Sequence, residues 1–349
     1  MNVAPTVALM RYLVPLCAAL ALNQPAAAGE VTVAADGSAQ FKSVQEAIMA
    51  GPPTSATYWW TVRIKPGTYK ELLYVQRERG FLRLIGDHAT NTVITFDLNA
   101  NLPGRDGKPI GTFRTPTAFL DADNIVAENL TFENSAGPVG QALAVRLDGD
   151  RLVFRNCRFL GWQDTIFANR GRHYFENCHI AGHVDFIFGA ATAWFERCEI
   201  LCLRDGYITA PSTPSDQPFG FVFNGCKVSG ASAEVKTYLG RPWRPFGSSV
   251  LLNTELSTVV RAAGWNNWSD PARERTARFA EFQSQGLGAN LSARVAWAKQ
   301  FTETEAKAIT VQRVLGASDG WNPMQTSASV NTGREFPGGS LRDLQRTGD

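Results

Sequence analysis

The chain has 349 residues, which is enough for one large domain or two ordinary ones with a sizeable buried core. Its formal net charge of +2 at pH 7 is too small for the basic surface that binding to nucleic acid or to a membrane surface requires. Charged residues make up only 19% of the sequence and glycine occurs 31 times, a composition that favours a turn-rich β protein over a helical one.

The first 28 residues have the three parts of an export signal. Arg11 supplies a positive charge, residues 12–22 form an apolar run, and residues 26–28 (AAA) offer a cleavage site. The apolar run is far shorter than the roughly 20 residues that span a bilayer, so no membrane anchor is expected. We predict a signal peptide at 1–28, export to the periplasm or the medium, and a mature chain that begins near Gly29.

A short phrase recurs along the middle of the chain. Its copies are FRNCRF at 154–159, FENCHI at 175–180, FERCEI at 195–200 and FNGCKV at 223–228. Intervals near 20 residues, with short β-rich segments separated by Asn, Gly and Asp, are typical of a parallel β-helix, in which each coil is one rung of stacked strands. We predict an all-β parallel β-helix. A β-sandwich with chance similarity between its strands is the alternative.

Four polar residues recur at the same interval. Asp164 precedes Asp185 by 21 positions, and Gln141 precedes Gln163 by 22. Residues one coil apart lie about 4.8 Å apart, the spacing of neighbouring strands. We therefore expect two amides and two acids to gather on one face, over three consecutive rungs.

Two stacked aspartates favour carboxylate chemistry. Both cannot ionise cheaply at this separation, so one should keep its proton and act as an acid while the other acts as nucleophile or base. The four histidines have no metal-ligand spacing such as HExxH, and no GxSxG motif is present. We predict an enzyme without metal or cofactor.

The cysteines of the repeated phrase should stack as well. Neighbouring rungs bring Cα atoms within reach of a disulfide, and an exported protein can form one, with Cys178 and Cys198 as the first choice. The alternative is an interior ladder of free thiols, because cysteine packs as a small apolar residue.

Several blocks resemble the pectin methylesterase (pectinesterase) family of β-helical carbohydrate esterases. The resemblance covers nearly the whole mature chain. The matching blocks are ADGSAQFKSVQEAI (35–48), IKPGTYKE (64–71), GQALAVR (140–146), GWQDTIF (161–167), VDFIFG (184–189), GYITAP (206–211), YLGRPW (238–243), GWNNW (264–268) and RVAWAKQFTETEA (294–306).

The resemblance implies a right-handed coil with short flanking helices in a domain at 29–325. The segment after Pro323 is rich in Ser, Thr, Gly and Arg, which predicts a polar C-terminal tail at 326–349. It also implies a monomer that binds pectin, that is, methylated homogalacturonan, and hydrolyses its methyl esters.

The resemblance assigns a role to each residue of the acid cluster. It implies that Asp185 is the nucleophile, that Asp164 is the general acid and base, and that the amides of Gln141 and Gln163 bind the oxyanion. Arg241 would hold Asp185 ionised and aimed, because an opposite charge lowers the pKa of a carboxyl group.

Substrate contacts are also implied by the resemblance. The expected residues are Trp243, Phe188, Thr117 and Trp265, with Thr115 as a further candidate. Arg170 and Lys236 are candidates for contacts to free carboxylates of the substrate, with a solvated loop charge as the alternative for each. Two positions depart from the family pattern: Trp162 stands where tyrosine is usual, and His183 where a small polar residue is more common. If His183 faces the cleft, its charge would stabilise the Asp185 carboxylate.

Other activities remain as alternatives on the same scaffold. A related esterase or thioesterase would use the same catalytic residues. Residues 63–65 (RIK) are similar to an element of polygalacturonases, but they lie upstream of the acids. A lyase needs a calcium-binding group of acids, which we do not see near Gln163 and Asp164. A binding β-helix without activity is disfavoured because the whole residue set is present.

Overall fold

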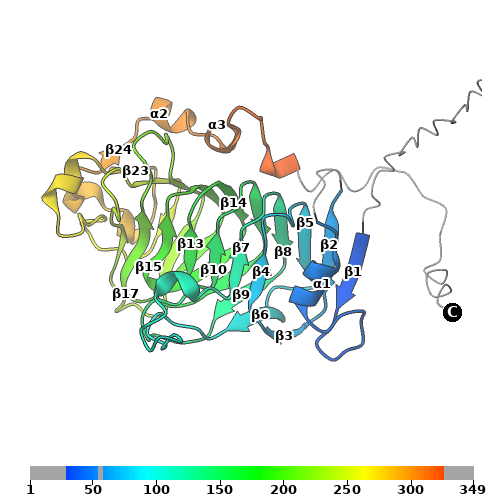
Figure 1. Cartoon of the computed structure of the whole chain (residues 1–349). Helices are drawn as coiled ribbons and strands as arrows, with labels where there is room; N and C mark the ends of the chain where they lie inside the picture. Colours follow the sequence, from blue (N-terminus) through cyan, green and yellow to red (C-terminus); the bar gives the residue numbers. More distant parts are fainter. Residues whose placement is uncertain (1–28, 54–57, 326–349) are drawn as a thin grey trace, which may run out of the picture.

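A computed structural model describes residues 29–53 and 58–325. The predicted signal peptide (1–28) and polar tail (326–349) lie outside the described residues. The described chain is an elongated stack of short strands, and every pair of neighbouring strands runs parallel (Figure 1). The predicted parallel β-helix is confirmed.

One ladder of strands, sheet A, runs the length of the molecule with eleven members. In spatial order they are β1 (Gly29–Val33), β2 (Trp60–Ile64), β5 (Leu82–Gly86), β8 (Ile125–Glu128), β11 (Leu152–Arg155), β14 (Arg172–Glu176), β16 (Thr192–Glu196), β18 (Phe221–Asn224), β21 (Ser248–Leu252), β23 (Arg278–Phe282) and β24 (Lys299–Gln300).

Two further ladders complete the coil, and the long strands β15 and β17 join them into one 13-stranded sheet. The first, ladder B, contains β3 (Gly67–Lys70), β6 (Thr92–Phe96), β9 (Thr131–Asn134), β12 (Arg158–Leu160), β15 (His179–Gly189), β17 (Glu199–Pro211), β19 (Lys227–Gly230) and β22 (Glu255–Leu256). The second, ladder C, contains β4 (Leu73–Val75), β7 (Ala118–Leu120), β10 (Val145–Leu147), β13 (Ile166–Ala168), the later halves of β15 and β17, and β20 (Thr237–Gly240).

The repeated phrase marks the turn between sheet A and ladder B. Its third position is Asn156, Asn177 or Arg197, with φ of 50°, 52° and 50°, and the fourth copy has Gly225 at φ 59°. Asn and Gly adopt this left-handed conformation more readily than other residues. The phrase therefore repeats because each coil turns the same corner.

The interior is filled by ladders of identical side chains. Phe154, Phe175, Phe195 and Phe223 stack in sequence, with ring centroids 4.8, 4.6 and 4.4 Å apart. All four are buried. Offset-stacked rings of this kind add to the free energy gained from apolar burial.

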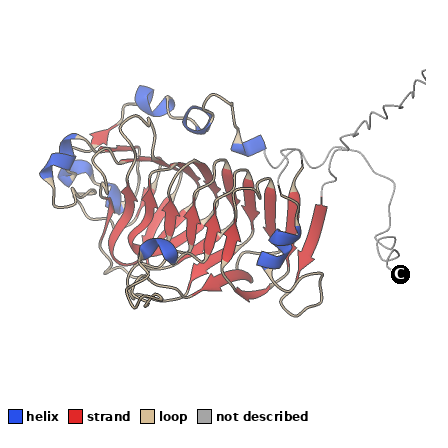
Figure 2. Ribbon diagram, in the orientation of Figure 1, coloured by secondary structure: helices blue, strands red, loops and turns tan. Residues whose placement is uncertain are grey.

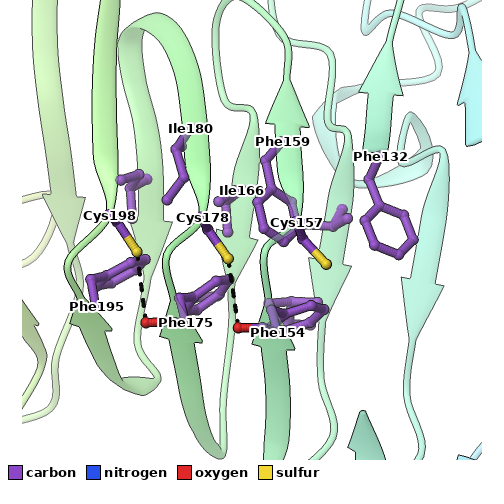
Figure 3. Packing of buried hydrophobic residues seen from close by; sticks show 14 of the residues in the cluster. Phe132, Phe154, Cys157, Phe159, Ile166, Phe175, Cys178, Ile180, Phe195 and Cys198 are labelled. Atoms are coloured by element: carbon purple, nitrogen blue, oxygen red, sulfur yellow. Dashed lines mark hydrogen bonds between the residues drawn. The ribbon is translucent and has the colours of Figure 1, made fainter. Parts of the chain in front are cut away.

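Cys157, Cys178 and Cys198 form a second interior ladder beside these rings (Figure 3). All five cysteines of the described residues are buried and unbridged. The thiols of Cys178 and Cys198 donate to the carbonyl oxygens of Phe154 and Phe175, each at 3.6 Å. Of the two alternatives, the structure has the free thiols, and Cys178 is not joined to Cys198.

The helices are short and lie at the periphery of the coil (Figure 2). Helix α1 (Val44–Ala50) packs at the N-terminal end, while α2 (Glu303–Lys307) and α3 (Val311–Leu315) lie along sheet A. The described residues also contain five 3₁₀ turns: η1 (Thr112–Arg114), η2 (Pro271–Arg275), η3 (Leu287–Ala289), η4 (Leu291–Ala293) and η5 (Pro323–Gln325). Within the described ranges no helix has the length and apolar character needed to cross a membrane.

We expect Phe175→Ala to lower the free energy of unfolding by about 3–5 kcal/mol, because it opens a cavity between two stacked rings. Phe246→Ala is the matched control, since Phe246 is 39% exposed. Denaturant unfolding of both variants measures the difference. Equal losses in the two variants would contradict the role given to the ring ladder.

Candidate active site

The coil brings the predicted polar residues onto three consecutive rungs. Gln141 and Gln163 pair in a parallel bridge, which places them on adjacent rungs. The Asp164 amide donates to the Val184 carbonyl at 3.1 Å, so the next rung carries Asp185 beside Asp164. The stacking predicted from the 21-residue and 22-residue intervals is present.

Both acids lie on strained backbone. Asp164 has φ of 67° and Asp185 has φ of 51°. Each left-handed residue other than glycine costs on the order of 1–3 kcal/mol, and such strain gathers at functional sites. The same conformation recurs at the corners of the coil, so at these two positions it is a cost of placing the acids side by side.

The acids open into a cavity of about 240 Å³ on the outer face of ladder C. Its lining contains seven of the predicted residues: Gln141, Gln163, Asp164, Asp185, Phe188, Arg241 and Trp243. Four more were not predicted: Thr112, Phe113, Ala210 and Trp268. Trp268 belongs to the GWNNW block, from which the resemblance had indicated Trp265.

Thr117 and Trp265 do not line this cavity, which corrects two of the expected substrate contacts. Thr117 is fully buried and donates to the Glu133 carbonyl at 2.7 Å. Trp265 is 1% exposed, and its indole N–H donates to Glu281 at 3.0 Å. Both side chains serve the interior of the coil.

Three other candidates also lie elsewhere. Thr115 is fully buried, and its hydroxyl donates to the Thr112 carbonyl. Arg170 is exposed outside the cavity lining, with its Nε 3.7 Å from an Asp148 carboxylate oxygen. The Lys236 ammonium group donates to two carbonyl oxygens of neighbouring loops, each at 3.1 Å.

Arg241 binds Asp185 through two parallel hydrogen bonds. Its Nε and one terminal nitrogen donate to the two carboxylate oxygens at 2.9 and 2.7 Å. The guanidinium is stacked between Tyr207 at 3.7 Å and Trp268 at 3.8 Å, measured to the ring centroids. A planar guanidinium suits both contacts, so the two rings hold Arg241 in the orientation that fixes Asp185.

The surroundings separate the two acids electrostatically. Burial raises the pKa of Asp164 well above its usual range, and the nearby Asp185 charge raises it further. Burial also raises the pKa of Asp185, but the hydrogen bonds and charge of Arg241 oppose that shift. Arg241 therefore lowers the pKa of Asp185, as expected, but by less than burial raises it. Asp185 should ionise first and Asp164 should keep its proton.

Three other polar side chains of the cavity are free to bind a ligand. Among the described residues, the side-chain amides of Gln141 and Gln163 and the Asp164 carboxyl group make no hydrogen bond. Free amide N–H groups can bind a developing oxyanion, and a protonated carboxyl group can give its proton to a leaving group. In the described chain, no group of three or more His, Cys, Asp or Glu side chains is placed to hold a metal ion.

The parallel β-helix and the acid pair on its outer face place the protein among the β-helical enzymes that use carboxylates for their chemistry. The Pectinesterase family model matches residues 30–318. Pectinesterase 31 of Arabidopsis thaliana is 40% identical over 282 residues, which are 79% of this chain and 89% of that protein. The chain therefore belongs to the Pectinesterase family, and it is an esterase.

Solved structures agree with this assignment. Pectin methylesterase from carrot matches with a TM-score of 0.77 and 34% identity, covering 83% of this chain and 93% of that one. A pectin methylesterase solved in complex with a hexasaccharide has a TM-score of 0.74 and 30% identity, covering 84% of this chain and 98% of that one.

The raised pKa of Asp164 predicts a pH-dependent effect on stability. A carboxyl group with a higher pKa in the folded state favours folding while protonated, and this contribution is lost as the pH rises through the folded-state pKa. We expect Asp164→Asn, which cannot ionise, to be more stable than the wild type at alkaline pH by on the order of 1 kcal/mol, with little difference at about pH 4. Thermal unfolding across this range measures the gap. A gap that stays constant or shrinks with rising pH would contradict the assignment.

Proposed function

We propose that the protein hydrolyses the methyl esters of galacturonate units in pectin, releasing methanol and pectate. The observation that carries this proposal is the Asp185 carboxylate, held by two hydrogen bonds from Arg241 beside the buried, unpaired Asp164. One acid is poised to attack and the other to supply a proton, as ester hydrolysis through an acyl-enzyme requires.

In the first half of the reaction, an Asp185 oxygen attacks the ester carbonyl carbon. The carbonyl oxygen becomes an oxyanion, which the free amides of Gln141 and Gln163 stabilise. The bond to the methoxy group then breaks, and Asp164 gives its proton to the departing oxygen, so methanol leaves. The product on the enzyme is an anhydride between Asp185 and the galacturonate carboxyl group.

In the second half, water attacks the anhydride. Asp164, now ionised, takes a proton from the water, which returns it to its starting state. The Asp185 carboxylate is the leaving group, and Arg241 stabilises its returning charge. The sugar carboxylic acid is released and ionises to pectate.

The walls of the cavity suit a sugar chain. Phe188 and Trp243 lie 5.8 Å apart between ring centroids, and Phe113 leans over Phe167 at 5.0 Å. Aromatic rings pack against the apolar C–H faces of pyranose rings, while polar groups at the base of the cavity orient the ester. We assign Phe188 and Trp243 to substrate binding and add Phe113 and Trp268.

The RIK element at residues 63–65 does not support the alternative of a polygalacturonase-like depolymerase. Arg63 lies in β2 on sheet A, away from the acid pair, and is paired with Glu30 at 2.6 Å. A thioesterase would use the same catalytic residues, and no feature of the cavity favours it. Export through the predicted signal peptide and action as a monomer complete the proposal.

Two assays run together test the esterase. Wild-type protein should release methanol from highly methylated pectin without producing new reducing ends. Asp185→Asn should lower kcat by at least about 10³-fold, because the nucleophile is lost. New reducing ends would indicate a depolymerase, and full activity in Asp185→Asn would refute Asp185 as the nucleophile.

His183 is close enough to influence the nucleophile. It lies on β15 with one buried ring nitrogen that has no partner, and its ring meets Trp162 edge-on at 5.8 Å. A positive charge on His183 lowers the pKa of Asp185. We expect His183→Thr to move the acid limb of the kcat/KM profile to higher pH by on the order of half a unit. His179→Thr, on the same strand, is the control, and an unchanged acid limb in His183→Thr would end the idea.

A further inference from the structure

Two chain segments make one wall of the cavity. The 241–243 segment carries Arg241 and Trp243, and the 266–270 segment carries Trp268; all three side chains line the cavity. Arg241 makes both hydrogen bonds to the proposed nucleophile, and the Trp268 ring covers its guanidinium at 3.8 Å. A shift of one segment against the other would therefore loosen the hold on the nucleophile.

The outer part of the 266–270 segment has an unfavourable backbone. Trp268 and Ser269 have φ of 61° and 56°, two consecutive left-handed residues other than glycine. Such a conformation persists only where the surroundings hold it. The side-chain oxygens of Asn266 and Asn267 accept hydrogen bonds from the amides of Trp268 and Ser269 at 2.8 and 3.0 Å. These local bonds shape the turn but do not connect it to the neighbouring segment.

Arg273 supplies that connection. It lies in η2, directly after the 266–270 segment, and one terminal nitrogen donates to the carbonyl oxygens of Pro242 and Trp243 at 2.5 and 3.2 Å. Its Nε donates to the Asp270 carboxylate at 3.1 Å. Among the described residues, no other donor binds these two carbonyl groups. One side chain therefore joins the two segments beyond the strands that carry them.

Arg273 also contacts the ring that covers Arg241. Its guanidinium carbon lies 5.7 Å from the Trp268 ring centroid, within the range of a cation–π contact. The Arg273 side chain is only 20% exposed, so these contacts are largely shielded from solvent. Loss of this side chain would remove a neighbour of Trp268 and the link to Trp243 at the same time.

We propose that Arg273 is a positioning residue of the esterase, which holds the 241–243 and 266–270 segments together so that Arg241 keeps both hydrogen bonds to Asp185. Arg273 does not line the cavity, so it acts through its neighbours and not on the substrate. This inference rests on the proposed function and deepens it by assigning a role to a residue outside the cavity.

The pH profile of kcat/KM separates a positioning role from a purely structural one. Within the described chain, the charged groups that act on Asp185 are Arg241, His183 and Asp164, and Arg273→Ala leaves all three in place. A loosened Arg241 lowers the pKa of Asp185 less, so the acid limb should move to higher pH, by on the order of half a unit. We also expect kcat on methylated pectin to fall about tenfold.

The chain offers a control with the same charge on the same turn. Arg275 also lies in η2 and is exposed, so Arg275→Ala removes a positive charge without removing the link between the segments. It should leave kcat and the acid limb unchanged. Arg273→Lys should lie between Arg273→Ala and the wild type, because an ammonium group can still donate to the two carbonyl oxygens.

Thermal unfolding first shows that each variant is folded at the assay temperature; if Arg273→Ala is not, Arg273→Lys carries the same test. Wild-type kcat in a folded variant, or a fall in kcat with an unmoved acid limb, would overturn the proposal. An NMR titration of the Asp185 carboxyl group gives a reading that does not depend on turnover. A wild-type protein that releases no methanol, while Arg273→Ala still raises the pKa of Asp185, would overturn the esterase function and leave the positioning role standing.

Discussion

The stacking of each coil on the next in a constant register is the constraint on which the other features depend. Phe154, Phe175, Phe195 and Phe223 can form an unbroken column only if every coil turns the same corner and returns to the same place. Tight packing of identical rings penalises a slip by one residue, because the alternation of strands would turn a buried side chain outward. The same register then aligns the residues on the outer face, so the core and the site are specified together.

The site holds its two acids in surroundings that disfavour their ionised forms. Burial raises the pKa of both aspartates, and the left-handed backbone at Asp164 and Asp185 adds strain. Arg241, held between Tyr207 and Trp268, stabilises the charge of Asp185 and leaves Asp164 without a partner. This unequal treatment gives two identical side chains different roles, one as a nucleophile and one as an acid. Stability is lost at the place where reactivity is gained.

The outer surface of ladder C follows the same register as the core. Residues that share a position on successive rungs form a straight line on the surface, so a linear polymer finds a linear series of contacts. A β-helix thus offers recognition of a repeating substrate by a repeating surface.

Much of this arrangement was predictable because it depends on intervals along the chain. The spacing of the repeated phrase determined the parallel β-helix, and the spacing of Asp164 and Asp185 determined that they meet, since both follow from one coil length. Details that depend on local backbone direction were not predictable. The GWNNW block does not show which of its two tryptophan rings faces the cavity: Trp265 is buried, whereas Trp268 lines the cavity. The choice between free thiols and a Cys178–Cys198 bridge, and the stacking of Arg241 between two rings, were likewise decided only by tertiary packing, because both depend on side chains from distant coils meeting at particular angles.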